Sequence, residues 1–163
     1  MEKNAILSED RKYRYVLWRI WDQTKPIVLF IALNPSTADE ITDDRTVCKC
    51  MGFARKWDYG GITLVNLFAF RATKPVDLIN EPDPIGPEND KWIEDQLGKA
   101  DLVVGTWGNH GGFMGRGAFI LEKIPDLYYL KMNKTGHPAH PLYLSYETNL
   151  EKMIFDPDIH LAN

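Results

Sequence analysis

Residues 27–36 read IVLFIALNPS, and this stretch decides the fold. Its first seven residues are all apolar, which is typical of a strand buried on both faces of a parallel sheet. Pro35 stops the strand, because proline cannot donate a hydrogen bond to a sheet ladder. Three further strands are expected downstream, over residues 62–68, 101–106 and 127–132.

Helical patterns alternate with these strands. A helix capped by Asp43 or Asp44 is expected first, followed by helices over residues 88–99 and 118–123. Upstream, residues 13–21 (YRYVLWRIW) indicate a strand near a sheet edge. The alternation predicts a three-layer α/β/α fold with a central, mostly parallel four-stranded sheet and an N-terminal edge strand, all in one domain over residues 1–163.

Composition limits the function classes. The chain has 23 acidic and 19 basic side chains, which argues against a protein whose main activity is binding nucleic-acid backbone. No apolar run reaches the ~18 residues of a membrane span, and the N-terminus lacks the pattern of a secretory signal. The two cysteines, Cys48 and Cys50, are too few for a disulfide framework, so a cytoplasmic location without membrane contact is expected.

Ligands of such sheets bind beyond the carboxyl ends of the strands. Four segments lie there: the one that starts at Asn34, the one that starts at Asn66, the glycine-rich residues 107–117 and residues 135–145. The glycine-rich segment could bring N–H groups close to an anion, but it matches neither a P-loop nor a dinucleotide fingerprint.

Each segment also has a plain structural interpretation. The amide of Asn34 could satisfy local backbone groups at a proline turn. The amide of Asn66, inside an apolar strand, either bonds neighbouring backbone or faces a pocket, because burying it without partners is costly. His137 and His140 lie in a loop with two His-Pro pairs, and most loop histidines are surface residues.

Four short motifs occur in order: L-N-P at residues 33–35, L-V-N-x4-R-A at 64–72, W-G-N-H-G at 107–111 and H-P-L-Y-L at 140–144. This series resembles the uracil-DNA glycosylase superfamily. The L-N-P-S-T-A-D and H-P-L-Y stretches also resemble a group of small uncharacterised bacterial and phage proteins. The chain departs from the glycosylase pattern in lacking glycine before Asn34 and after Pro35, and it lacks the cysteines of the iron–sulfur branches, so no cofactor is expected.

The resemblance implies an N-glycosidase in which water attacks the anomeric carbon and a base departs. Asn34 would position the water and His140 would donate a hydrogen bond to the departing base, which makes these two the candidate catalytic residues. Asn66 would read the base, since its amide offers one donor group and one acceptor. The full set of candidate substrate-binding residues is Pro35, Asn66, Phe68, Phe70, Arg71, Trp107, Asn109, His110, Arg116 and His137.

Two alternatives stay open. The chain could instead be a non-catalytic nucleobase- or nucleotide-binding module that kept the pocket. Cys48, Cys50, His137 and His140 could offer zinc ligands, but C-x-C lies on an expected helix and differs from the usual C-x2-C, so no metal is expected. The expected partners are a nucleobase, a nucleotide or single-stranded nucleic acid, and protein partners stay open.

Overall fold

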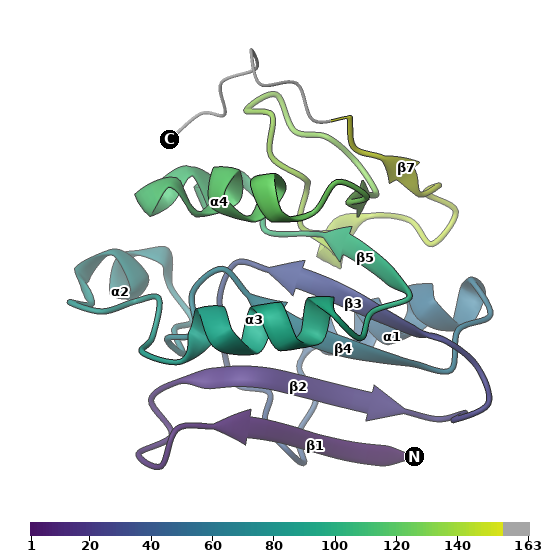
Figure 1. Cartoon of the computed structure of the whole chain (residues 1–163), viewed down its shortest axis with the longest axis horizontal. Helices are drawn as coiled ribbons and strands as arrows, with labels where there is room; N and C mark the ends of the chain where they lie inside the picture. Colours follow the sequence, from purple (N-terminus) through teal and green to yellow (C-terminus); the bar gives the residue numbers. More distant parts are fainter. Residues whose placement is uncertain (155–163) are drawn as a thin grey trace.

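The computed structural model describes residues 1–154, which form a mixed α/β fold around one sheet of seven strands (Figure 1). The strand order is β1-β2-β4-β3-β5-β6-β7. The strands are β1 Glu2–Leu7, β2 Arg14–Ile20, β3 Ile27–Ala32, β4 Gly61–Asn66, β5 Leu102–Gly105, β6 Tyr128–Tyr129 and β7 Glu151–Lys152. The α/β class expected from the alternation of strands and helices is confirmed.

The sheet is larger and more mixed than the expected four strands with one edge strand. β3 pairs in parallel with β4 and β5, and β5 pairs in parallel with β6. The remaining pairs, β1 with β2, β2 with β4 and β6 with β7, are antiparallel. The expected strand at residues 13–21 forms as β2, but it is an inner strand, because β1 pairs along its outer side from Glu2 opposite Ile20.

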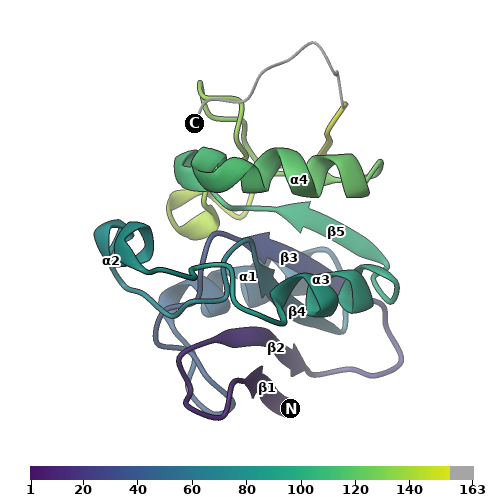
Figure 2. The same cartoon turned by 60° about the vertical axis from the view of Figure 1, so that its left-hand side comes forward.

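The helices lie on both faces of the sheet. The α-helices are α1 Arg45–Lys56, α2 Pro75–Asn80, α3 Asn89–Leu97 and α4 Arg116–Lys123, and the 3₁₀ helices are η1 Asn109–Gly115 and η2 Pro141–Tyr143. Figure 2 shows α3 and α4 in front of the sheet and α1 behind it. The apolar run of β3 serves both faces: Val28 and Phe30 pack in the cluster that contains α1, and Leu29 and Ile31 in the cluster that contains α3 and α4.

The strand ends that carry the predicted site residues meet at one edge of the sheet. Ala32 of β3 lies opposite Asn66 of β4, so Asn34 and Asn66 follow neighbouring strand ends. Thr106, just after β5, donates its backbone N–H to Ile31 on the other side of β3 at 2.8 Å. Asp44 caps α1 beside this edge by accepting a hydrogen bond from the backbone N–H of Val47 at 2.9 Å.

No helix within residues 1–154 combines the length and apolarity that a membrane span needs.

Candidate functional site

A pocket of about 410 Å³ opens at the carboxyl ends of β3, β4 and β5, and we call it the Asn66 pocket. Its volume is in the range of small-molecule sites. Its lining residues are Arg14, Ala32, Leu33, Asn34, Pro35, Ser36, Asp44, Thr46, Leu64, Asn66, Ala72, Thr73, Trp107, Gly108, Asn109, His110, Asn133 and His140. Seven of the twelve predicted site residues are therefore brought together here: Asn34, Pro35, Asn66, Trp107, Asn109, His110 and His140.

Asn66 is the unusual residue of the pocket. It is 1% exposed, and neither its Oδ1 nor its Nδ2 has a hydrogen-bond partner among the described residues. The backbone carbonyl of the same residue is satisfied, because the Nδ2 of Asn89 donates to it at 2.9 Å. A buried amide with both functions unused is costly, and such a group in a native protein calls for an explanation. A ligand that offers one acceptor and one donor would supply both missing partners.

The amide of Asn34 has its donor group engaged, and its Oδ1 accepts no hydrogen bond from the residues that the structure describes. Its Nδ2 donates to the backbone carbonyls of Pro35 at 3.0 Å and Ala72 at 2.7 Å. The two carbonyl partners fix the orientation of the amide, since only the NH₂ group can donate to them. The local role considered for this residue is therefore real, and the Oδ1 is the atom left to accept a hydrogen bond from water or a ligand.

His140 lines the pocket and carries a hydrogen-bond donor on its ring. Its Nδ1 accepts a hydrogen bond from the backbone N–H of Leu142 at 3.2 Å, so the neutral ring carries its proton on Nε2. Although one side of the residue is exposed, desolvation of the buried part lowers the pKa of the imidazole below its ordinary 6.5, and the carboxylate of Asp44 acts in the opposite direction. The neutral form, with Nε2–H as donor, is therefore favoured at neutral pH.

Trp107 forms a wall of the pocket and is held from behind by His137. Its Nε1 donates to the Nδ1 of His137 at 3.0 Å, and the two side chains are 1% and 0% exposed. A Cβ at Gly111 would collide with the Trp107 indole, so the glycine-rich segment is needed at this position for close packing. His137, predicted to contact substrate, instead lies behind the pocket wall and orients the indole.

Two other predicted contacts lie away from the pocket. Phe68 is fully buried against Phe113, with ring centroids 5.4 Å apart, so it is not placed to stack on a base. Arg116 is 4% exposed, donates to the carbonyl of Leu67 at 3.0 Å and pairs with Asp90 at 2.6 Å. Its guanidinium is already engaged, so the predicted phosphate contact has no support in the geometry.

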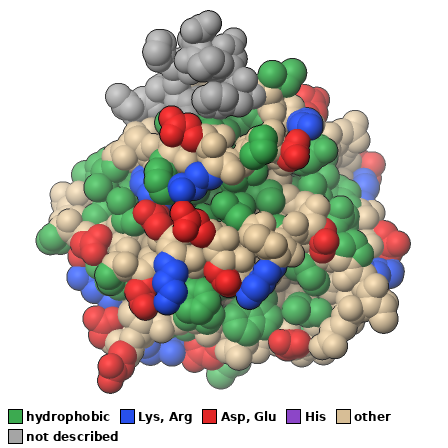
Figure 3. Space-filling view, viewed as in Figure 1, with side chains coloured by type: hydrophobic (Ala, Val, Ile, Leu, Met, Phe, Trp, Pro, Cys, Tyr) green, Lys and Arg blue, Asp and Glu red, His purple; other side chains and the backbone are tan. Residues whose placement is uncertain are grey.

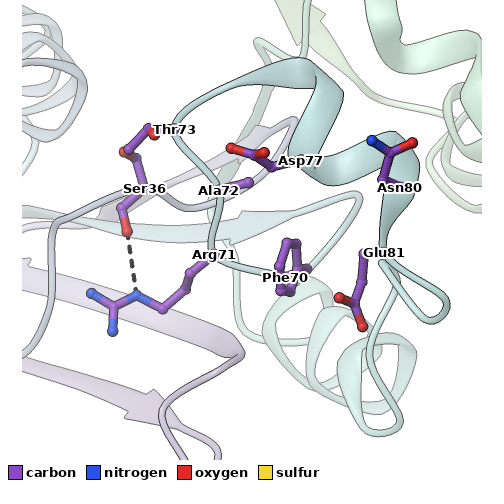
Figure 4. A pocket seen from close by; sticks show the side chains of 8 residues that line it. All are labelled: Ser36, Phe70, Arg71, Ala72, Thr73, Asp77, Asn80 and Glu81. Atoms are coloured by element: carbon purple, nitrogen blue, oxygen red, sulfur yellow. Dashed lines mark hydrogen bonds between the residues drawn. The ribbon is translucent and has the colours of Figure 1, made fainter.

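Phe70 and Arg71 line a neighbouring groove of about 480 Å³, which we call the Arg71 groove (Figure 4). The groove is lined by Ser36, Phe70, Arg71, Ala72, Thr73, Asp77, Asn80 and Glu81, and it shares Ser36, Ala72 and Thr73 with the Asn66 pocket. Arg71 donates to the carbonyl of Ser36 at 3.2 Å, the contact drawn as a dashed line in Figure 4. Asp77 and Glu81 bring two carboxylates to this groove, and Lys12 pairs with that of Glu81 at 2.6 Å. The carboxylate of Asp77 is therefore the main charge that opposes a phosphate chain here.

Six polar residues of the pocket escaped the sequence analysis as site residues: Arg14, Ser36, Asp44, Thr46, Thr73 and Asn133. Arg14 opens β2, whose other charged residue is Arg19, and a charged residue at the buried end of a largely apolar strand is the signal that could have found it. Asp44 and Thr46 belong to the start of α1, whose cap was predicted without reference to a site.

No group of three or more His, Cys, Asp or Glu side chains within residues 1–154 could hold a metal ion. Cys50 is fully buried in the packing of α1, and burial raises the pKa of its thiol. Cys48, by contrast, is exposed, so the two cysteines do not share one environment.

Fold and pocket together define an α/β protein with a pocket of small-molecule size at the carboxyl ends of its parallel strands. Residues 14–142 match the family described as "Protein of unknown function (DUF1643)", and the chain belongs to this family. No curated protein and no solved structure shows significant similarity to it. The matched residues include every residue that lines the Asn66 pocket.

Proposed function

We propose that this protein is an N-glycosidase of the uracil-DNA glycosylase type, which binds a nucleobase in the Asn66 pocket and releases it by water attack at the anomeric carbon. The observation that carries the proposal is the buried amide of Asn66, whose donor and acceptor both lack partners in a pocket of ligand size. A nucleobase edge presents adjacent donors and acceptors, and its flat ring suits the wall formed by Trp107.

The other pocket residues suit the steps of such a reaction. The Oδ1 of Asn34 would accept a hydrogen bond from the attacking water and so hold its lone pair toward the anomeric carbon. As the new C–O bond forms, the C–N bond breaks and its electron pair leaves with the base. The Nε2–H of His140 would stabilise the negative charge on the departing base, which then takes a proton from solvent, while the attacking water loses its proton to solvent.

A second candidate is a binding module that holds a nucleobase or nucleotide without cleaving it. It is favoured by the two hydrogen bonds that tie the amide of Asn34 to backbone carbonyls. These bonds give Asn34 a structural reason to be present, and an amide oxygen cannot take the proton of the attacking water.

Charge supports a small or single-stranded ligand over intact duplex. Acidic and basic side chains are interspersed on the face shown in Figure 3, without a large basic patch. Asp77 and Glu81 line the Arg71 groove next to the pocket. Binding to a duplex depends on several neutralised phosphates, which such a surface does not favour.

The two candidates differ in a base-release assay. Wild-type protein is incubated with nucleosides, nucleoside monophosphates, single-stranded oligonucleotides and duplexes, and released base is measured by chromatography while binding is measured by calorimetry. The N-glycosidase should release base from at least one monomeric or single-stranded substrate. Saturable binding without release would select the binding module, and the absence of both would contradict each candidate.

Acid should lower the stability of the protein through His140. Because the pKa of this group is lowered in the folded protein, the unfolded chain binds a proton more readily as the pH falls below 6.5, so the free energy of unfolding decreases there. Protonation also abolishes the acceptor at Nδ1 that Leu142 uses. The free energy of unfolding, measured by denaturant titration, should therefore be level from about pH 7 to 9 and fall below about pH 6. His140→Asn should lack this component of the acid loss of stability, and an unchanged profile in that variant would contradict the assignment.

A further inference from the structure

Arg14 differs from the other buried arginines of the described chain. Three arginines in residues 1–154 are nearly inaccessible: Arg14 at 1%, Arg19 at 0% and Arg116 at 4% exposure. Arg19 pairs with Asp43 at 2.7 Å and Arg116 pairs with Asp90 at 2.6 Å. Arg14 forms no ion pair with any described residue. A buried charge without a partner of opposite sign is costly, so its presence requires a reason.

The hydrogen bonds of Arg14 leave part of the guanidinium unused. Its Nη1 donates to the carbonyl of Ala38 at 3.0 Å, whereas its Nε has no partner among the described residues. Burial lowers the pKa of Arg14 to about 10, and the carboxylate of Asp44 counters part of this effect. The group is therefore still charged at neutral pH, and it lines the Asn66 pocket.

Strand order places Arg14 next to Asn66. The pocket residues lie at the ends of consecutive strands: Arg14 on β2, Asn66 on β4, Asn34 just after β3 and Trp107 just after β5. Arg14 thus lies beyond Asn66, on the side away from Asn34 and Trp107. The three unpartnered atoms of this part of the pocket, Arg14 Nε and both amide atoms of Asn66, therefore belong to neighbouring strands.

The start of α1 borders the same pocket through Asp44 and Thr46. Thr46 contributes a hydroxyl and lies in the first turn, where backbone N–H groups lack intrahelical partners and favour negative charge. Asp44 contributes the opposing charge, but its carboxylate accepts a hydrogen bond from Val47 and does not pair with Arg14. The surroundings of Arg14 thus supply several donors, and the nearby carboxylate of Asp44 attracts the guanidinium without forming an ion pair with it.

We infer that Arg14 is an anion-binding residue, and that the ligand of the Asn66 pocket carries a negatively charged oxygen group beside the edge that Asn66 reads. The identity of that edge rests on the proposed function, whereas the need for an anion rests on Arg14 itself. The charged group can belong to the base, as a carboxylate or an ionised ring oxygen, or to a phosphate on the sugar. The position of Arg14 beyond Asn66, away from Asn34, favours a group on the base.

The test compares ligands that differ in one charge. Calorimetric titrations would use uracil against its 6-carboxylate, each common nucleoside against its 5′-monophosphate, and inorganic phosphate alone. Wild-type protein should bind the charged member of at least one pair about 10- to 100-fold more tightly, as expected for one charge-assisted hydrogen bond. The pair that shows the preference identifies whether the base or the sugar carries the charge.

Variants separate ligand binding from folding. Arg14→Met fills a similar volume without charge and should reduce the charged-to-neutral affinity ratio to about 1, while Arg14→Lys should keep part of it. Arg45→Met removes the same charge from an exposed arginine of α1 that does not line the pocket, and it should leave the ratio unchanged. The ratio does not depend on overall stability, so a purely structural Arg14 would leave it unaltered in any variant that folds.

Two outcomes would overturn the inference. One is equal binding of charged and neutral members in every pair, and the other is the absence of binding for every anionic ligand. If neutral nucleosides bound through Asn66 as tightly as their charged counterparts, the role of Arg14 would be refuted and the proposed function would stand. Preference for charge without any base release would support Arg14 and refute catalysis.

Discussion

Replacing Asn66 by leucine is expected to stabilise the protein and to abolish its affinity for a nucleobase. The substitution removes a buried amide whose two polar functions are unpaired and introduces an apolar side chain of similar size. The free energy of unfolding should rise by about 1–3 kcal/mol, the usual cost of an unsatisfied buried polar group. Nucleobase affinity should fall at least ~10²-fold, since both hydrogen bonds to the ligand edge are lost. Denaturant unfolding and calorimetric titration measure the two quantities.

Asn89 offers a matched control for this experiment. It is also fully buried and its Oδ1 lacks a partner among the described residues, but its Nδ2 donates to the backbone carbonyls of Asn66 at 2.9 Å and Leu67 at 3.2 Å. Asn89→Leu removes both bonds and should lower the free energy of unfolding by about 1–3 kcal/mol. If Asn66→Leu destabilised the protein to the same extent, the amide of Asn66 would have a structural partner, such as a bound water, and the argument for a ligand would fail.

The inner strands could be predicted because burial on both faces leaves apolar runs, continuous in β3 and interrupted by Thr63 in β4. β1 could not, since three of its six residues are exposed and its sequence, EKNAIL, has no clear period. The strand expected over residues 127–132 forms only as the two residues of β6, and β7, also of two residues, is too short for any pattern. The sheet order likewise depends on pairing between distant segments, which is why β2 was expected near the edge.

The site could be predicted to the extent that it follows from parallel topology. Asn34, Asn66 and Trp107 each come directly at or after a strand end, and such ends meet at one edge of a parallel sheet. Arg14 lies at the start of β2, and it reaches the same edge only because β2 runs antiparallel to β4. A search confined to residues at or after the carboxyl ends of strands therefore misses Arg14.

The two histidines of the loop after β6 show a second limit to the prediction of site residues from sequence. His137 and His140 are three residues apart and both precede proline, so no local pattern separates them. Packing does: the side chain of His137 is enclosed behind Trp107, whereas His140 faces the pocket. Similarly, Arg116 lies in a glycine-rich segment and was predicted to bind substrate. Only the tertiary fold shows that its guanidinium pairs with Asp90.

Removing the Nε2–H donor of His140 is expected to lower base release at least ~10²-fold while leaving the fold intact, because this donor faces the charge that develops on the departing base. His140→Asn is the variant to use, since its side-chain oxygen can replace Nδ1 as acceptor for the backbone N–H of Leu142 but does not reach the position of Nε2. His140→Gln is the companion, because its terminal NH₂ can stand near the position of Nε2, and it should keep more activity than His140→Asn. Single-turnover base release measures the effect, and thermal unfolding should show both variants within about 1 kcal/mol of the wild type. Base release by His140→Asn at the wild-type rate would remove His140 from the reaction, and equal loss in both variants together with lowered stability would make its role structural.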